Sequence, residues 1–194
     1  LKNTWVDYLA VKELKKIWEP SSQGRITKWS QIREGFPDKE IRLFGPGTDS
    51  GTFDYFTEAI CGTVSSSRGD YTASEDDNVL VEGIASDAQA LGYFGLAYYE
   101  QNKDKLKIVP IDDENDANGK GPIEPSSQSV MDSTYQPLAR PIFIYVSTQA
   151  AKKEEVQKFV EFYLKNAPEL VAEVGYIPLS KEAYAAVLER FKKR

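Results

Sequence analysis

Segments with strand-like character alternate along this chain with segments whose apolar residues recur at helical spacing, and this alternation restricts the fold more than any other feature. At 11–18 the apolar residues fall at positions 11, 14, 17 and 18 with charged residues between them, which predicts an amphipathic helix that ends at Pro20. Helices are also expected at 53–60, 79–84, 153–166 and 181–193, and strands at 41–44, 108–111 and 141–146, with a strand joined to a helix over 90–99. Strands separated by helices, without an internal repeat, predict an α/β fold.

The charge balance argues against two classes of partner. The 194 residues include 30 acidic and 24 basic side chains, for a net charge of −6. The chain therefore lacks the basic surface that attracts nucleic acids or anionic membranes. Because 41% of the residues are hydrophobic, a core in one domain or two small lobes is expected.

The residue types on which much of catalysis depends are scarce. The sequence has no histidine and a single cysteine, Cys61, which removes His-based zinc sites and triads, CxxC redox motifs and intramolecular disulfides. Cys61 is expected to be a small buried residue on a helix. We therefore expect a protein that is not an enzyme and that holds neither a metal ion nor an organic cofactor.

The most informative motif is Ser50-Gly51-Thr52, which follows a predicted strand and a Gly-rich turn and opens the predicted helix at 53–60. Backbone N–H groups at a helix start are unpaired, and the helix dipole adds about half a positive charge there. The two hydroxyl groups can donate further hydrogen bonds, and Gly51 lets an oxyanion approach the backbone closely. This pattern indicates an anion site.

A second interpretation of the same motif is purely structural. Asp49 or Ser50 can cap the helix, and the glycines can serve only to turn the chain. Neither of the Gly-rich nucleotide-binding motifs is present, so a nucleotide phosphate loop is not supported.

Two further patterns have simpler explanations than function. Asp76 and Asp77 suit the N-terminal end of the helix at 79–84, since adjacent side chains there do not converge on a metal ion. The Arg68-Gly69-Asp70 tripeptide is too common to indicate cell adhesion. The Asp-rich stretch 112–125 lacks calcium-loop spacing and is expected to be a solvated loop.

The sequence begins as though it had been cut from a longer precursor. Leu1 is not methionine, and the sequence continues directly into Asn3-Thr4-Trp5. No apolar run approaches the roughly 20 residues needed to cross a bilayer. We treat the sequence as a piece of a longer protein.

Several stretches, taken in order, resemble one family. These are a K-I-x-x-W-like segment at 24–29, the G-x-x-S-G-T region at 47–52, L-G-Y-x-x-x-A-Y at 91–98, and G-Y-x-P-L at 175–179. Together they are similar to the phosphate-binding proteins of high-affinity phosphate ABC transporters. The residues within these stretches resemble a bacterial and cyanobacterial branch of that family most. The resemblance covers nearly the whole chain.

The resemblance implies a fold of the periplasmic-binding-protein type II, in which phosphate is clamped between two lobes. Residues 1–140 would form the central phosphate-binding lobe. Residues 141–194 would supply the hinge strand and the C-terminal helices of the other lobe, whose N-terminal part is absent. The implied partners are inorganic phosphate and the membrane permease subunits of the transporter. The implied location is periplasmic or extracytoplasmic, with anchoring through the missing N-terminus as an option.

The implied phosphate ligands are Ser50, Gly51, Thr52 and Asp49. Many family members carry an Arg four residues before the Ser and an Asp two residues before it, where this chain has Pro46 and Thr48. We expect Arg68, in the loop after the helix, to replace the missing guanidinium, because Arg binds two phosphate oxygens at once.

Two other functions remain open. A receptor of the same architecture can take another oxyanion, such as sulfate or molybdate, or can be a relative that has become a scaffold. An enzyme acting on phosphate esters is the remaining alternative, although the sequence offers no Walker lysine and no acidic cluster at metal-ligand spacing.

Overall fold

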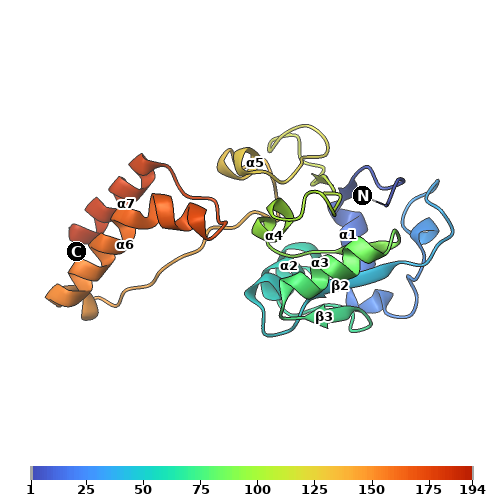
Figure 1. Cartoon of the computed structure of the whole chain (residues 1–194), viewed down its shortest axis with the longest axis horizontal. Coiled ribbons are helices and arrows are strands. Elements are labelled where there is room, and N and C mark those ends of the chain that lie inside the picture. The colour runs from blue at the N-terminus through green and yellow to red at the C-terminus, as the bar shows by residue number, and fades with distance from the viewer. Residues whose placement is uncertain (1, 194) are drawn as a thin grey trace. The chain divides into compact units, whose positions relative to one another are not determined.

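The structure, a computed structural model, describes residues 2–193 and divides into two compact units. The first unit ends at Ala139 and the second begins at Arg140. Each unit is described separately below (Figure 1). No helix in the part of the chain that the structure describes is long and apolar enough to cross a membrane.

A three-stranded parallel sheet lies at the centre of the first unit. Strand β2 (Arg42–Pro46) is the middle strand, between β3 (Thr72–Ser74) and β4 (Ala90–Gly92). Pro46 lies opposite Ser74 in the register, and Phe44 lies opposite Gly92. The parallel sheet with helical crossovers confirms the predicted α/β class.

A second, smaller sheet pairs two distant segments. Strand β1 (Leu9–Ala10) runs parallel to β5 (Ile111–Asp112). The strand predicted at 108–111 is therefore shorter and begins later than expected. Strands β1 and β3 were not predicted, because two or three residues cannot display a strand periodicity.

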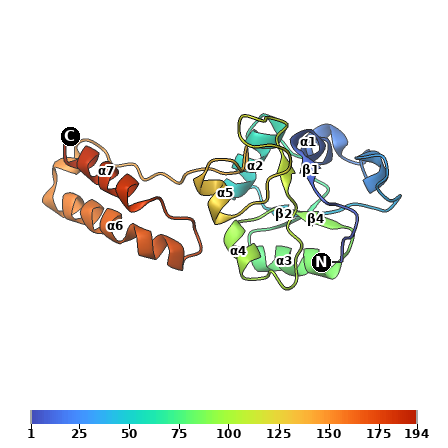
Figure 2. The same ribbon diagram turned by 90° about the horizontal axis from the view of Figure 1, so that it is seen from above.

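Helices cover both faces of the central sheet. In Figures 1 and 2, α3 lies along one face, and α1 and α2 lie on the opposite side. The helices of the first unit are α1 (Val11–Trp18), α2 (Gly51–Cys61), α3 (Asp77–Ser86), α4 (Leu96–Glu100) and α5 (Ser127–Met131), with short 3-10 turns at Pro20–Ser22 and Trp29–Gln31.

Aromatic side chains dominate the core of the first unit. Trp18 and Trp29 are fully buried. The ring of Trp18 meets the rings of Phe56 and Tyr93 edge to face, and Phe56 stacks on Tyr93 with 3.7 Å between ring centroids. Such contacts add to the burial of apolar area and fix helix α2 against α1 and the sheet.

The second unit is a pair of helices preceded by a long connection. Helix α6 (Glu154–Glu173) packs against α7 (Lys181–Lys192), and a 3-10 turn at Ala150–Lys152 comes before them. Both helices were predicted, and α6 extends further than the expected end at residue 166.

The strand predicted at 141–146 is not formed, so this prediction was wrong. The segment pairs with no other strand among residues 2–193. Its side chains lie largely in solvent, with 67% of Ile142, 65% of Phe143 and 91% of Tyr145 exposed. A strand needs a neighbouring strand for its hydrogen bonds, and sequence periodicity cannot supply one.

Candidate functional site at the start of helix α2

The candidate site lies where the parallel strands of the central sheet end. Strands β2 and β3 finish level with each other at Pro46 and Ser74, and β4 runs in the same direction on the other side of β2. The chain then turns through residues 47–50 and enters helix α2 at Gly51. Ligands of open α/β sheets bind at the carboxyl ends of the strands, so α2 starts at the edge where a ligand is expected.

Ser50 is the N-cap of α2, as the structural interpretation of the motif predicted. Its Oγ accepts a hydrogen bond from the backbone N–H of Thr52 at 3.2 Å. Its own N–H donates to the carbonyl of Gly47 at 3.2 Å. A serine hydroxyl that accepts one hydrogen bond still has its own proton to donate, so capping leaves Ser50 able to bind an anion.

Unpaired donors remain at the same helix start. Among residues 2–193, no acceptor lies within hydrogen-bonding reach of the backbone N–H of Gly51 or of Phe53. The next amide, that of Asp54, is already bonded to the carbonyl of Ser50 at 3.1 Å. Two free N–H groups, the helix dipole and two hydroxyls together form a donor set that matches an oxyanion.

The predicted ligands around the cap differ in exposure. Gly51 and Asp49 are exposed, whereas Ser50 and Thr52 are partly buried. An ionised carboxylate only accepts hydrogen bonds, so Asp49 can contact an oxyanion only through a proton that the oxyanion carries. Its role therefore stays a prediction.

Glu75 lies at the same edge and was not among the predicted residues. Its carboxylate rests against Gly47, so that a Cβ on residue 47 would come within 1.9 Å of Oε1. The neighbouring carboxyl of Asp77 has a raised pKa, because burial and the charges of Asp76 and Glu75 all disfavour its ionised form. The only sequence signal for these contacts is the acidic run after β3, which we assigned to the cap of α3. Asp76 does cap α3, accepting from the N–H of Asn78 at 2.9 Å.

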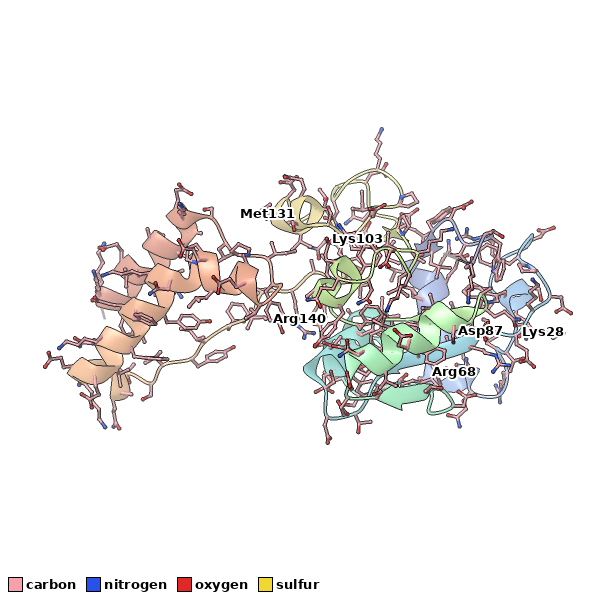
Figure 3. The ribbon with its side chains drawn as sticks, in the orientation of Figure 1. Lys28, Arg68, Asp87, Lys103, Met131 and Arg140 are labelled. Carbon is pink, nitrogen blue, oxygen red and sulfur yellow. The ribbon has the colours of Figure 1, made fainter. Side chains whose placement is uncertain are left out.

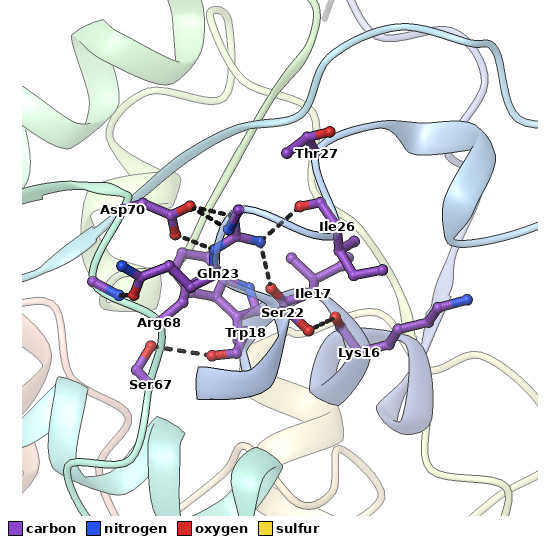
Figure 4. A network of polar contacts seen from close by, with 12 residues as sticks. Lys16, Ile17, Trp18, Ser22, Gln23, Ile26, Thr27, Ser67, Arg68 and Asp70 are labelled. Atoms are coloured by element: carbon purple, nitrogen blue, oxygen red, sulfur yellow. Dashed lines mark hydrogen bonds and ion pairs between the residues drawn. The ribbon is translucent and has the colours of Figure 1, made fainter.

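Arg68 has a different environment from the one expected. Only 4% of its surface is exposed, and its guanidinium donates to both carboxylate oxygens of Asp70, at 2.5 and 2.8 Å (Figure 4). It also donates to the carbonyls of Ile17 at 3.0 Å and Ile26 at 2.9 Å. Figure 3 shows Arg68 among the side chains of the first unit.

These contacts make Arg68 a buried and paired side chain, and its expected role as a phosphate ligand stays a prediction. Its recorded partners are Asp70 and the backbone at and after the end of α1, and none of them belongs to the Ser50-Gly51-Thr52 turn. Asp70 also accepts from the N–H of Gly24 at 3.1 Å, so the Arg-Gly-Asp sequence closes on itself and joins two loops. The spacing of Arg and Asp two residues apart is the signal that could have predicted this pairing.

No metal centre accompanies the site. Within the described part of the chain there is no group of three or more His, Cys, Asp or Glu side chains that could hold a metal ion. The groups that this edge offers to a ligand are the backbone amides and hydroxyls at the start of α2.

The structure defines an α/β protein in which a helix with unpaired N–H groups starts at the end of a parallel sheet. Residues 2–167 match the PBP superfamily domain, and the chain belongs to this family. Among curated proteins, Protein SphX of Synechocystis sp. is 52% identical over 184 residues, which are 94% of this chain and 53% of that protein. The phosphate-binding protein PstS of Staphylococcus haemolyticus is 34% identical, over 98% of this chain and 57% of its own length.

Solved structures share this fold. A structure described as a possible phosphate binding protein from Planctomyces limnophilus has a TM-score of 0.87 and 42% identity, and covers 99% of this chain and 66% of its own. An ABC-type phosphate transport receptor from Vibrio cholerae has a TM-score of 0.68 at 24% identity, over 89% of this chain and 64% of its own, and supports the fold alone. The chain spans about half the length of the curated relatives it matches.

Proposed function

We propose that this chain is part of an extracytoplasmic solute-binding protein that captures inorganic phosphate and delivers it to an ABC transporter. The observation that carries the proposal is the pair of unpaired N–H groups of Gly51 and Phe53 beside the Ser50 and Thr52 hydroxyls. The homology to phosphate-binding proteins supports phosphate as the anion.

Binding of this kind requires no covalent chemistry. The amides and hydroxyls at the start of α2 are fixed in place before the anion arrives, so little reorganisation is needed. The net charge of −6 does not prevent binding, because distant surface charges are screened over about 8–10 Å of salt solution while the helix start acts at contact.

We propose that residues up to 140 form the central lobe and that residues 141–194 are part of a second lobe. The second unit supports this division, because Phe159 and Phe162 on the amphipathic helix α6, and Val174 directly after it, are more than 60% exposed. Large apolar side chains exposed on an amphipathic helix fit a surface that another part of the protein covers. The remaining length of the relatives is sufficient to supply such a cover.

The proposed role is binding without catalysis, in contact with the permease subunits outside the cytoplasm. The sequence lacks histidine and a Walker lysine, and the start of α2 offers donors but no nucleophile with an adjacent general base. Anchoring of the protein to the membrane through its preceding segment is part of the same proposal.

Another oxyanion is the second candidate ligand. Amide and hydroxyl donors match sulfate as well as phosphate, because both anions accept hydrogen bonds through their oxygen atoms. Competition between the two anions in one titration separates these candidates.

The test is isothermal titration with phosphate, then sulfate, of the protein with the segment that precedes residue 1 restored. Ser50→Ala combined with Thr52→Val removes two hydroxyl donors, and we expect phosphate affinity to fall by roughly a hundredfold or more, since each hydrogen bond to a charged group contributes about 1.5–3 kcal/mol. Ser180→Ala is the matched control, because Ser180 caps α7 in the same way, accepting from the N–H of Ala183 at 3.1 Å. Wild-type protein that binds neither anion, or a double variant with unchanged affinity, would contradict the proposal.

A further inference from the structure

One loop of the first unit carries an asparagine in a reactive sequence context. Asn118 is the only asparagine of the sequence that is followed by glycine. The loop lies between β5 and α5 (Figure 1), and its base is closed by two hydrogen bonds of 2.9 Å between the backbones of Ile111 and Ile123. Asn118 and Gly119 are both partly buried. The pair therefore has a defined conformation, although it belongs to neither a helix nor a strand.

The side-chain amide of Asn118 is held by a carboxylate. Its Nδ2 donates to Oδ2 of Asp113 at 2.5 Å, and its backbone N–H donates to the carbonyl of Asn115 at 3.0 Å. The other carboxylate oxygen of Asp113 accepts from the N–H of Asn115 at 3.0 Å. Both oxygens of Asp113 thus hold residues 113–118 together, and one of them uses the amide of Asn118.

The backbone nitrogen of Gly119 has no such restraint. Among residues 2–193, its N–H donates to no hydrogen-bond acceptor. Its φ is +143°, a conformation that L side chains rarely adopt. The absence of a side chain also leaves this nitrogen unshielded. A nucleophilic nitrogen and the amide carbon of Asn118 are therefore neighbours in the chain.

We infer that Asn118 is a site of spontaneous deamidation and that its hydrogen bond to Asp113 controls the rate. The Gly119 nitrogen loses its proton and attacks Cγ of Asn118, the bond from Cγ to Nδ2 breaks, and ammonia leaves with that proton. The resulting cyclic succinimide then takes up a water molecule at either of its carbonyls, which yields aspartate or isoaspartate at this position. No oxidant or reductant takes part. Because the attack requires Cγ to turn toward Gly119, a bond that holds the amide at Asp113 slows the first step.

The product removes the contact that closes the loop. The amide of Asn118 donates to Asp113, whereas an ionised carboxylate at the same position only accepts hydrogen bonds. Two carboxylates at this separation disfavour each other's ionised form. The reaction therefore opens residues 113–118 and gives the chain a further negative charge. It does not involve the start of α2, so the inference is independent of the proposed function.

The experiment uses the protein with its preceding segment restored, incubated at pH 8 and then digested for peptide mass spectrometry. We expect Asn118 to be converted roughly tenfold faster or more than Asn115, which lies in the same loop but is followed by Asp116. Asp113→Ala should accelerate the conversion of Asn118 by roughly tenfold, the factor that one hydrogen bond to a charged group supports. Asp116→Ala is the matched control, because Asp116 is exposed and has no hydrogen bond or ion pair among the described residues.

Three results would overturn the inference. Conversion of Asn118 that is no faster than that of Asn115 would remove the site. Equal rates in Asp113→Ala and Asp116→Ala would remove the role of Asp113. A difference between these two variants that persists in urea, where the loop is unfolded, would show that the effect is local and does not come from the structure.

The consequence for the loop has its own test. Asn118→Asp imitates one product, and trypsin should cleave after the exposed Lys120 several-fold faster in this variant than in wild type. Asn115→Asp is the control, because its side chain can still accept from the N–H of Ala117, at 3.2 Å in the wild type. Equal cleavage of the two variants would show that the loop stays closed and would contradict the expected opening.

Discussion

Replacement of Arg68 by methionine separates a structural role of this residue from a ligand role. The variant keeps the aliphatic part of the side chain and removes the guanidinium. Its two bonds to the carbonyls of Ile17 and Ile26 are lost, and each bond from a charged donor is worth about 1.5–3 kcal/mol before the cost of burying the charge. The pair with Asp70 adds on the order of 1 kcal/mol or less, because 34% of the Asp70 side chain is exposed and solvent screens the attraction.

We expect the free energy of unfolding of the first unit to fall by about 3 kcal/mol, which is the lower estimate for the two lost bonds from the charged donor. Urea unfolding followed by tryptophan fluorescence measures it, since Trp5, Trp18 and Trp29 all belong to the first unit. Arg25→Met is the control, because Arg25 is exposed and has no ion pair or side-chain hydrogen bond among the described residues.

The effect should depend on pH with a definite sign. The hydrogen bond from Arg68 is the largest cause of the lowered pKa of the Asp70 carboxyl. A carboxyl with a depressed pKa in the folded state contributes stability above its unfolded value, about 3.9, and loses it as the pH falls through the folded value. The difference in free energy of unfolding between wild type and Arg68→Met should therefore be largest at pH 7 and become smaller below about pH 4.

Two results would refute this reasoning. A loss of stability below about 0.5 kcal/mol would place Arg68→Met among ordinary surface changes and contradict the structural role. A tenfold or greater loss of phosphate affinity in a variant of unchanged stability would return Arg68 to the site, as the sequence led us to expect.

Two further predictions concern packing and reactivity in the first unit. Gly92→Ala should lower the free energy of unfolding by about 1–3 kcal/mol in the same assay, because the new Cβ would lie 2.6 Å from the carbonyl oxygen of Phe44 and 2.5 Å from the side chain of Ile84. The control is Gly95→Ala, whose new Cβ would have its nearest neighbour at 3.9 Å and should change the stability far less. Equal effects of the two variants would contradict the argument. Burial raises the pKa of the Cys61 thiol to about 11. At pH 8 the thiol should therefore react with a thiol reagent roughly a hundredfold more slowly in the folded protein than in urea. Similar rates in the two states would show that the thiol is not buried.

The elements with strong local signals were predictable from the sequence. The apolar spacing of Val11–Trp18 and the stop at Pro20 gave α1 with its observed bounds. Ser50 and Ser180 are N-cap residues, and each is followed by a helix that starts within two residues of the predicted position. Caps and periodicities act between residues a few positions apart, so they are visible without a fold.

The contacts that join distant segments required the tertiary structure. Arg68 donates a hydrogen bond to the carbonyl of Ile17, and Tyr55 donates one to the carbonyl of Pro137. Glu75 contacts Gly47. None of these pairs shares a local sequence motif. The three-residue strand β3 exists only because β2 lies beside it, and the apolar run 141–146 failed to form a strand because no partner was present.

The sequence by itself therefore determined the α/β class and the helices with clear apolar spacing, and it predicted an anion site at the turn before α2. The tertiary structure decided which side chains stand beside that turn, because hydrogen bonds and ion pairs between distant residues depend on where the whole chain brings them. It paired Arg68 with Asp70, and it brought Glu75 to the edge where the predicted site lies.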